Sequence, residues 1–163
     1  MRLTTKLPPA SPSSFKRAFV QLQPGSVLRA TYIGGDFTLP REPNTRLLFI
    51  AAGVGITPFR SMLAHMLATR DRRHVTIIYT ATHTDALLYR MLLKRAEHEL
   101  NTKTYFVTDT SLDDDFFARY HIDPSGTHAY LSGPPQMVDS LRATLAKTPN
   151  RPVRIVTDYF TGY

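Results

Sequence analysis

The sequence has no cysteine and no tryptophan among its 163 residues. Without cysteine, the chain has no disulfide bonds, no metal sites built from thiolates and no cysteine nucleophile. The six histidines are scattered and show no ligand spacing such as H-E-x-x-H. We therefore predict no metal site.

Long apolar runs are also lacking. No stretch approaches the roughly 18 consecutive apolar residues that a membrane-spanning helix requires. Residues 1–12 carry charge but lack the apolar core of a secretory signal. We therefore expect a cytoplasmic protein with no membrane span in this chain, although a longer parent protein could attach to a membrane from the cytoplasmic side.

Acidic residues are fewer than basic ones, which leaves a formal net charge of +7. This charge favours anionic partners without choosing among nucleic acid, an acidic membrane surface, a dinucleotide and an acidic redox protein. The basic residues are spread from Arg2 to Arg154, and no aromatic side chains are interleaved with the densest run, residues 70–73. We expect no nucleic acid partner; a basic nucleic-acid-binding domain, with steeply salt-dependent binding, is the third of our interpretations.

The chain is long enough for one folded domain, and 42% of its residues are hydrophobic. From residue 46 onward, short β-branched or apolar runs alternate with segments of helical periodicity, which indicates a parallel sheet with crossover helices. The expected strands are Leu47–Ala52, Val75–Tyr79, Thr104–Val107, His128–Leu131 and Val153–Val156. The expected helices are Pro58–Thr69, Asp85–Leu100, Asp113–Tyr120 and Pro134–Ala146. We predict an α/β fold with a five-stranded doubly wound parallel sheet, whose ligand binds outside the carboxyl ends of the strands.

The first 45 residues have a different pattern. It predicts one helix, Ser13–Leu22, and two short strands, Val27–Ile33 and Phe37–Leu39. One helix and two strands are too few for a stable domain. We therefore interpret residues 1–45 as the end of a larger unit and residues 46–163 as a complete domain.

The loop after the first strand of the sheet reads AAGVGITPFR, residues 51–60. Gly53 and Gly55 allow a tight turn and the close approach of a phosphate. Thr57 is a candidate N-cap and Pro58 suits the first position of a helix, so backbone N–H groups at the helix start would face an anion. A tight turn that binds no ligand remains an alternative.

Three motifs in order resemble the ferredoxin–NADP reductase family of flavin enzymes. GVGITPFRSM at residues 53–62 resembles its pyrophosphate loop, and YLSGPPQM at residues 130–137 resembles its C-G-P-x-x-M motif. DYFTGY at residues 158–163 resembles the acidic and aromatic tail with which many members end. Cofactors of this family are NAD(P)H and FAD, so the resemblance implies an NAD(P)-binding domain over residues 46–163.

The resemblance extends into the first segment. SSFK at residues 13–16 and GGDFTLP at residues 34–40 resemble the end of the family's flavin-binding barrel. The R-x-Y-S/T strand that holds the flavin in the family has no counterpart in this chain. The resemblance therefore implies that residues 1–45 are the remnant of an antiparallel flavin-binding β-barrel, and that this chain alone lacks a complete flavin site.

Site residues follow from these motifs by resemblance. Ser132 stands where many members have a cysteine beside the nicotinamide, Phe160 or else Tyr163 is the tail aromatic that covers the flavin ring, and we favour Phe160. The residues implied as catalytic are Thr57, Ser132 and Phe160. The residues implied in cofactor binding are Gly53, Val54, Gly55, Thr57, Pro58, Thr80, Ala81, His83, Asp109, Thr110, Gly133, Pro134, Pro135 and Met137, with Ser14 and Lys16 beside the flavin pyrophosphate.

The charge of two loops bears on the choice between NADH and NADPH. The family's NADPH users place cations or hydroxyls around the 2′-phosphate, whereas the loop after the third expected strand carries Asp109. The loop after the second strand offers only His83, which is neutral at most working pH values. Both loops favour NADH.

The resemblance implies an FAD-dependent NAD(P)H oxidoreductase. Hydride would pass from NAD(P)H to flavin N5, and electrons would then leave singly to an acceptor protein or domain with an iron–sulfur or haem centre. This chemistry requires no general acid or base from the protein, and the sequence has no nucleophile elbow or paired catalytic carboxylates. The alternative is a non-catalytic dinucleotide-binding or regulatory module.

Overall fold

The computed structural model describes residues 4–5, 7, 13–29, 34–83, 86–108 and 112–160. Within them lies a sheet of five parallel strands in the order β3-β2-β1-β4-β5. Its strands are β1 (Arg46–Ala52), β2 (Val75–Thr80), β3 (Thr102–Val107), β4 (Thr127–Gly133) and β5 (Arg154–Tyr159). The predicted α/β fold with a five-stranded parallel sheet is confirmed.

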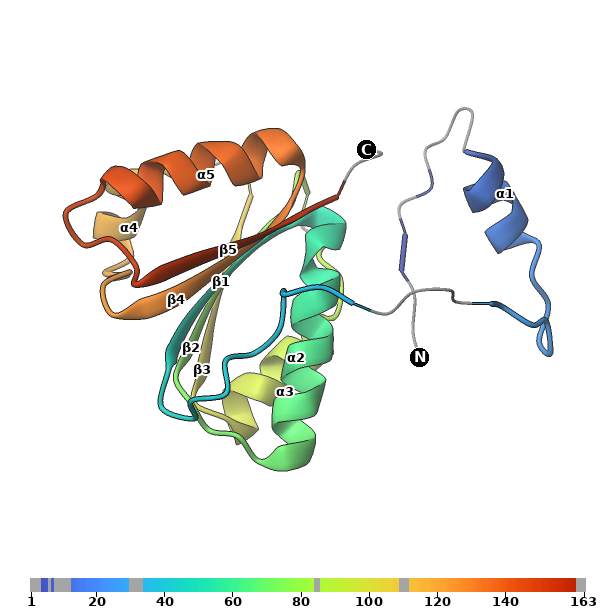
Figure 1. Ribbon diagram of the computed structural model, residues 1–163, viewed down its shortest axis with the longest axis horizontal. Coiled ribbons are helices and arrows are strands. Elements are labelled where there is room, and N and C mark those ends of the chain that lie inside the picture. Colours follow the sequence, from blue (N-terminus) through green and yellow to red (C-terminus); the bar gives the residue numbers. More distant parts are fainter. Residues whose placement is uncertain are drawn as a thin grey trace.

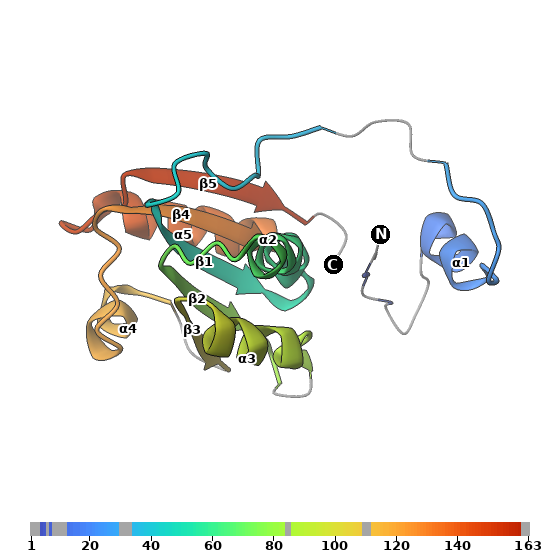
Figure 2. The same cartoon turned by 90° about the horizontal axis from the view of Figure 1, so that it is seen from below.

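Helices cover both faces of the sheet (Figures 1 and 2). One face is packed by α2 (Ile56–Thr69) and α3 (Arg90–Glu99). The other is packed by α4 (Asp114–Arg119) and α5 (Pro135–Lys147). The chain leaves β1 toward β2 and β3 on one side and later places β4 and β5 on the other, so the strand order reverses between β1 and β4.

The central strand β1 shows why the sequence forms this core. Leu47, Phe49 and Ala51 face the α2–α3 layer, while Leu48 and Ile50 face the α4–α5 layer, and all five are almost fully buried. A strand buried on both faces requires a continuous apolar run, as is usual in parallel sheets. This run made the strand recognisable in the sequence.

Element ends differ from the predicted ones by a few residues. β3 begins two residues earlier than expected, and β5 continues to Tyr159. The helix expected over Asp85–Leu100 begins only at Arg90, because Tyr89 takes the left-handed conformation at φ 58° and interrupts the helical turn. The expected first residue of that helix, Asp85, lies outside the described residues.

The described part of residues 1–45 contains one helix and no strand. Helix α1 (Ser14–Val20) is shorter than the predicted Ser13–Leu22, and Ser13 is its N-cap, whose hydroxyl accepts a hydrogen bond from the Lys16 N–H. The strand predicted over Phe37–Leu39 is absent, and so is the described part, residues 27–29, of the strand predicted over Val27–Ile33. The prediction over Phe37–Leu39 was wrong because, among the described residues, no strand lies beside this segment to pair with it. Residues 30–33 of the other predicted strand lie outside the described residues, and Val27 is 92% exposed.

Residues 37–40 instead pack against the sheet layer. The Phe37 ring lies 5.2 Å from the Tyr130 ring and 5.5 Å from the Phe59 ring. The Tyr130 hydroxyl donates to the Thr38 carbonyl oxygen at 2.7 Å. The connection into the sheet is therefore anchored, while α1 lies apart from the sheet in both views (Figures 1 and 2).

Candidate functional site

A cavity of about 430 Å³ lies at the carboxyl ends of the central strands. Its volume falls within the roughly 300–1,000 Å³ that is usual for ligand pockets. The lining residues are Thr4, Thr5, Ala52, Gly53, Val54, Thr80, Ala81, Thr82, Ala86, Leu88 and Pro134. The cavity therefore adjoins the point where the strand order reverses, as the sequence predicted.

The glycine loop forms one wall of this cavity. After β1 the chain makes a 3₁₀ turn, η1 (Gly53–Gly55), which continues directly into α2. Gly53 takes the left-handed conformation at φ 52°, which glycine adopts without steric cost. Gly55 has a different reason to be glycine: a Cβ atom there would lie 2.2 Å from the Ser132 carbonyl oxygen. The second glycine thus allows the loop to pack against the end of β4.

The start of α2 differs from the prediction. The helix begins at Ile56 with Gly55 in the N-cap position, and no side chain caps it. The prediction of Thr57 as the N-cap was wrong, because the 3₁₀ turn over Gly53–Gly55 continues into the helix and lets it start two residues earlier. Thr57 and Pro58 lie in the first helical turn, and neither lines the cavity.

The second wall is formed by the last residue of β2 and the segment after it. It contains the predicted Thr80 and Ala81, together with Thr82, Ala86 and Leu88, which sequence reasoning missed. His83 is exposed and follows the cavity-lining Thr82.

Tyr79, near the end of β2, joins the two walls. Its side chain is fully buried, its hydroxyl donates to the Gly53 carbonyl oxygen at 3.0 Å, and the Leu88 N–H donates to the same hydroxyl at 3.0 Å. Sequence reasoning assigned this residue only to a strand. The signal available was a tyrosine in a buried strand, whose hydroxyl requires a polar partner.

The end of β4 brings several predicted residues to the same edge. Ser132 is fully buried, and its Oγ has no hydrogen-bond partner among the described residues. A Cβ atom on Gly133 would lie 3.0 Å from the Ala52 Cβ and 2.6 Å from the Met137 Cε. Met137 lies in the first turn of α5 and packs against the core on the α4–α5 face of the sheet. Pro134 lines the cavity, and Pro135 is the first residue of α5.

The end of β5 lies beside the end of β4. Asp158 pairs in register with Ser132, and burial raises the pKa of its carboxyl group, although a hydrogen bond from the Tyr159 backbone opposes this effect. The Phe160 N–H donates to the Gly133 carbonyl oxygen at 3.0 Å. The structure thus brings the predicted Ser132 and Phe160 to the same edge. Tyr163 lies outside the described residues.

Two of the predicted residues are not brought to the cavity, and two others cannot be placed because they lie outside the described residues. Ser14 and Lys16 lie on α1, which is apart from the sheet (Figure 1). Asp109 and Thr110 lie outside the described residues.

Arg90, at the start of α3, is a cation that sequence reasoning missed. Its guanidinium carbon lies 5.6 Å from the centre of the Phe106 ring, near the carboxyl end of β3.

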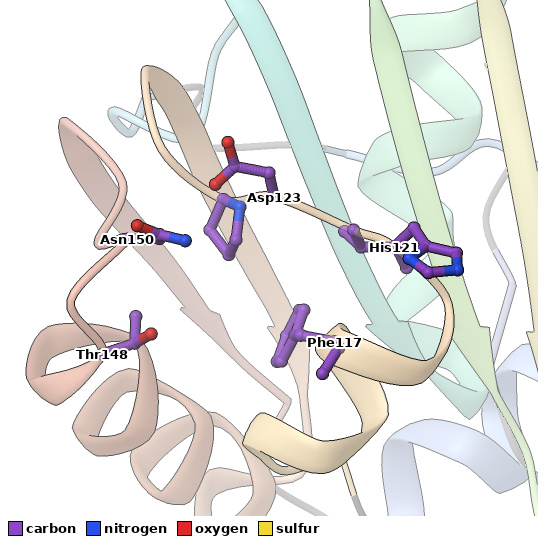
Figure 3. Close-up of a pocket in the computed structure, with 8 residues that line it drawn as sticks. Phe117, His121, Asp123, Thr148 and Asn150 are labelled. Carbon is purple, nitrogen blue, oxygen red and sulfur yellow. The ribbon is translucent and has the colours of Figure 1, made fainter.

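A second hollow, of about 390 Å³, lies at the opposite edge of the sheet (Figure 3). It opens between the segments that precede β4 and β5, and Phe117, Asp123, Thr148 and Asn150 are among its lining residues. The Asp123 carboxylate already accepts hydrogen bonds from the backbone and hydroxyl groups of Ser125. None of the predicted site residues lines this hollow.

The part of the chain that the structure describes contains no group of three or more His, Cys, Asp or Glu side chains placed to hold a metal ion. It also contains no helix with the length and apolar character needed to cross a membrane.

Comparison with protein families and curated proteins relates this site to known ones. Residues 49–143 match the family model described as "Oxidoreductase NAD-binding domain". The chain is 30% identical over 137 residues to the 2-halobenzoate 1,2-dioxygenase electron transfer component of Burkholderia cepacia, an alignment that covers 77% of this chain and 40% of that protein. It is 30% identical over 148 residues to oxidoreductase NAD-binding domain-containing protein 1 of Danio rerio, with 73% and 54% covered. The chain thus spans about half or less of the length of these relatives.

Solved structures of oxidoreductases also resemble this chain. The flavohemoglobin of Malassezia yamatoensis, with bound FAD and heme, matches with a TM-score of 0.74 at 25% identity, over 96% of this chain and 42% of that one. The ferredoxin-NADP+ reductase of Plasmodium falciparum matches with a TM-score of 0.65 at 19% identity, over 78% of this chain and 59% of that one. The second likeness is one of fold.

Proposed function

This chain belongs to the family of oxidoreductase NAD-binding domains of the ferredoxin reductase type, and on that premise we propose that it binds NADH for a flavin-dependent oxidoreductase. The observation that carries the proposal is the cavity between the glycine loop and the end of β2, at the point where the strand order reverses. Dinucleotides bind at this place in doubly wound sheets.

The residues at this edge fit such a cofactor. Gly53 and Val54 line the cavity, and the adjoining helix start has no side-chain cap, so its positive end is available to a pyrophosphate. Ser132 Oγ is a buried polar atom without a partner among the described residues, and a polar group of the nicotinamide would satisfy it. Pro134 would bound the cavity on the β4 side.

The cofactors supply the chemistry when bound, namely hydride transfer from NADH to FAD and onward electron transfer. This chain's part is to hold the dinucleotide along the glycine loop and to keep Ser132 and Phe160 beside the reacting end. In the complete protein, we propose that the electron acceptor is a protein or domain with an iron–sulfur or haem centre. The electron-transfer and flavohemoprotein relatives support this class of acceptor.

We further propose that residues 1–45 are the end of a flavin-binding barrel. The apolar side chains Phe15 and Val27 are 63% and 92% exposed, which is expected of a segment whose packing partner lies elsewhere. The match to the FAD-containing flavohemoglobin also covers 96% of this chain. If the rest of that barrel is not part of this chain, the purified chain is expected to retain no stoichiometric FAD, measured by its absorbance near 450 nm. Stoichiometric FAD would instead show that this chain holds a complete flavin site.

The test of NADH binding is a calorimetric titration of the full chain with NADH and with NADPH in one low-salt buffer. We expect saturable binding of NADH and weaker binding of NADPH. If neither binds, the dinucleotide-binding function fails. Equal or tighter binding of NADPH would retain the function and overturn the NADH preference, with Arg90 as the cation able to meet a 2′-phosphate.

The preference for NADH over NADPH is tested by a substitution at Asp109. Asp109→Arg replaces a repulsive carboxylate with a cation, so we expect it to tighten NADPH binding by about tenfold and to leave NADH binding nearly unchanged. Asp109→Asn is the matched control, because it removes the repulsion without adding a cation. An Asp109→Arg chain with unaltered NADPH affinity would exclude Asp109 as the selective residue.

A second candidate function is a module that binds the dinucleotide without catalysis. The observation that favours it is that the described part of residues 1–45 contains no strand, and so no flavin-binding barrel of its own. Diaphorase activity separates the two functions. In the complete protein with FAD, NADH-dependent reduction of ferricyanide supports the oxidoreductase, whereas NADH binding without turnover supports the module.

A further inference from the structure

We propose that Tyr79 is a positioning residue for the cofactor cavity, with its hydroxyl holding the two walls in register. The hydroxyl donates to the carbonyl oxygen of Gly53 on the glycine loop and accepts from the N–H of Leu88 on the segment after β2, both at 3.0 Å. Gly53 and Leu88 both line the cavity. This inference rests on the proposed function, since it assigns Tyr79 a task in dinucleotide binding.

The Tyr79 hydroxyl helps to fix the direction of a backbone carbonyl group in the glycine loop. The Gly53 carbonyl oxygen also accepts a hydrogen bond from the Ile56 N–H, so two donors hold its direction. In a trans peptide unit the carbonyl and the following N–H point in opposite directions. With the Gly53 oxygen held toward the Tyr79 hydroxyl, the Val54 N–H points the opposite way. Val54 lines the cavity, so the two donors to this peptide unit fix the backbone at the cavity wall.

The opposite wall depends on the same hydroxyl. Leu88 immediately precedes Tyr89, a non-glycine residue at φ 58°, a conformation that the surrounding contacts must maintain. The hydrogen bond from Leu88 N–H to the Tyr79 hydroxyl is one such contact. Without it, the segment after β2 loses a direct tie to the glycine loop.

The ring and the hydroxyl of Tyr79 have separable roles. The ring belongs to the apolar core on the α2–α3 face and lies 6.4 Å from the Phe106 ring. Phenylalanine at this position keeps that packing and removes only the hydroxyl. The variant Tyr79→Phe therefore leaves the sheet intact while disconnecting the two walls.

A matched control lies on the neighbouring part of the same sheet face. Tyr130 is also buried, and its hydroxyl donates to the Thr38 carbonyl oxygen at 2.7 Å, on the connection that precedes β1. Neither Tyr130 nor Thr38 lines the cavity. Tyr130→Phe thus removes a buried tyrosine hydroxyl bond of the same kind without touching the site.

The experiment compares the full-length wild-type chain with both variants by calorimetric titration with NADH. We expect Tyr79→Phe to raise the Kd for NADH by about five- to tenfold, because a hydrogen bond at each wall is lost, and Tyr130→Phe to leave it within about twofold. Hydrogen exchange adds a readout without ligand: the Leu88 amide is expected to exchange faster in Tyr79→Phe only. Equal Kd values for the two variants would overturn the inference, whatever the exchange rate at Leu88.

The outcome also distinguishes this inference from the proposed function. If the wild-type chain binds NADH and Tyr79→Phe binds it equally well, the positioning role is wrong and the function stands. If the wild-type chain binds no dinucleotide, the function fails and the positioning role for a cofactor fails with it. Faster exchange at Leu88 would then still identify Tyr79 as the tie between the two segments.

Discussion

Gly55 and Ser132 approach so closely that a Cβ atom on Gly55 would lie 2.2 Å from the Ser132 carbonyl oxygen and 2.6 Å from its carbonyl carbon. Both neighbours are backbone atoms of β4, which cannot rotate away as a side chain can. The glycine loop is therefore seated on the end of β4, and the cavity is built on that contact.

We expect Gly55→Ala to destabilise the chain by about 3 kcal/mol, at the upper end of the usual cost of overpacking, because backbone must move to accept the methyl group. Urea unfolding measures the change in the free energy of unfolding. Val54→Ala, in the same loop, is the control, because it removes side-chain atoms at a partly exposed position and is expected to change stability far less. A Gly55→Ala chain as stable as Val54→Ala would contradict the close contact.

Phe37 supplies a second prediction, about the segment that connects residues 1–45 to the sheet. Its ring packs at 5.5 Å from Phe59 and 5.2 Å from Tyr130, so Phe37→Ala is expected to lower the free energy of unfolding by about 2–3 kcal/mol. Phe15→Ala is the control, because this α1 side chain is 63% exposed and its loss is expected to be nearly neutral. Equal effects of the two substitutions would show that the connection is not anchored by Phe37.

Much of the fold could be predicted because the sheet is buried on both faces. A strand such as β1 must be apolar at every position, and the turns that follow it must carry glycine or proline, so the strands and their order in the chain are visible in the sequence. The strand predicted over Phe37–Leu39, which the structure does not contain, shows the limit of this reasoning. Phe37 and Leu39 have the apolar spacing of a strand, but spacing does not reveal whether a partner strand exists.

The site was predictable to the level of its loops. Gly53, Val54, Thr80, Ala81 and Pro134 follow from the resemblance and lie in loops at the carboxyl ends of parallel strands, and all five line the cavity. Their part in cofactor binding stays a prediction.

The reasons for individual residues at the site were harder to see. Gly55 is glycine because β4 passes beside it, and β4 is distant in sequence. The role of Tyr79 depends on a backbone carbonyl 26 residues away, which no local pattern encodes.

Asp71 and Arg73 lead to a prediction about acid stability. Burial acts to raise the pKa of Asp71, but the hydrogen bonds and charge of Arg73 outweigh it, so the pKa lies below its ordinary value. The Arg73 side chain is 6% exposed and also donates to the Pro40 carbonyl oxygen at 3.0 Å. This ion pair therefore holds the connection before β1 as well as the turn before β2.

Because the folded-state pKa of Asp71 is lowered, its contribution to stability is present above the unfolded-state pKa of about 3.9 and is lost as the pH falls through the folded-state value. Asp71→Asn is expected to be less stable than the wild type at pH 7, with a difference that narrows below about pH 4. Thermal unfolding across pH measures this. Glu99→Gln breaks an exposed pair with Arg95 and is the control, with little change expected. If the stability difference between Asp71→Asn and the wild type is as large at pH 3 as at pH 7, the effect comes from packing and not from the ion pair.

Asp158 gives the opposite prediction. Its carboxyl group is half-buried at the end of β5, and burial raises its pKa in spite of the hydrogen bond from the Tyr159 backbone. The folded state therefore disfavours the ionised form, and the stability that the protonated form provides is lost as the pH rises through the folded-state pKa. Asp158→Asn, which resembles the protonated acid, is expected to unfold at a higher temperature than the wild type at pH 7.

The direction of the stability change in Asp158→Asn is tested by lowering the pH and by comparison with a second acid, Asp123. The difference between Asp158→Asn and the wild type is expected to vanish below about pH 4, where the unfolded-state carboxyl is also protonated. Hydrogen bonds from Ser125 lower the pKa of Asp123, so Asp123→Asn is expected to destabilise at pH 7 instead. If Asp158→Asn is less stable than the wild type at pH 7, the prediction is wrong and the folded protein stabilises the Asp158 carboxylate. A stabilising effect would mean that an acid beside Ser132 is kept at the expense of stability, as is common for residues that serve a site.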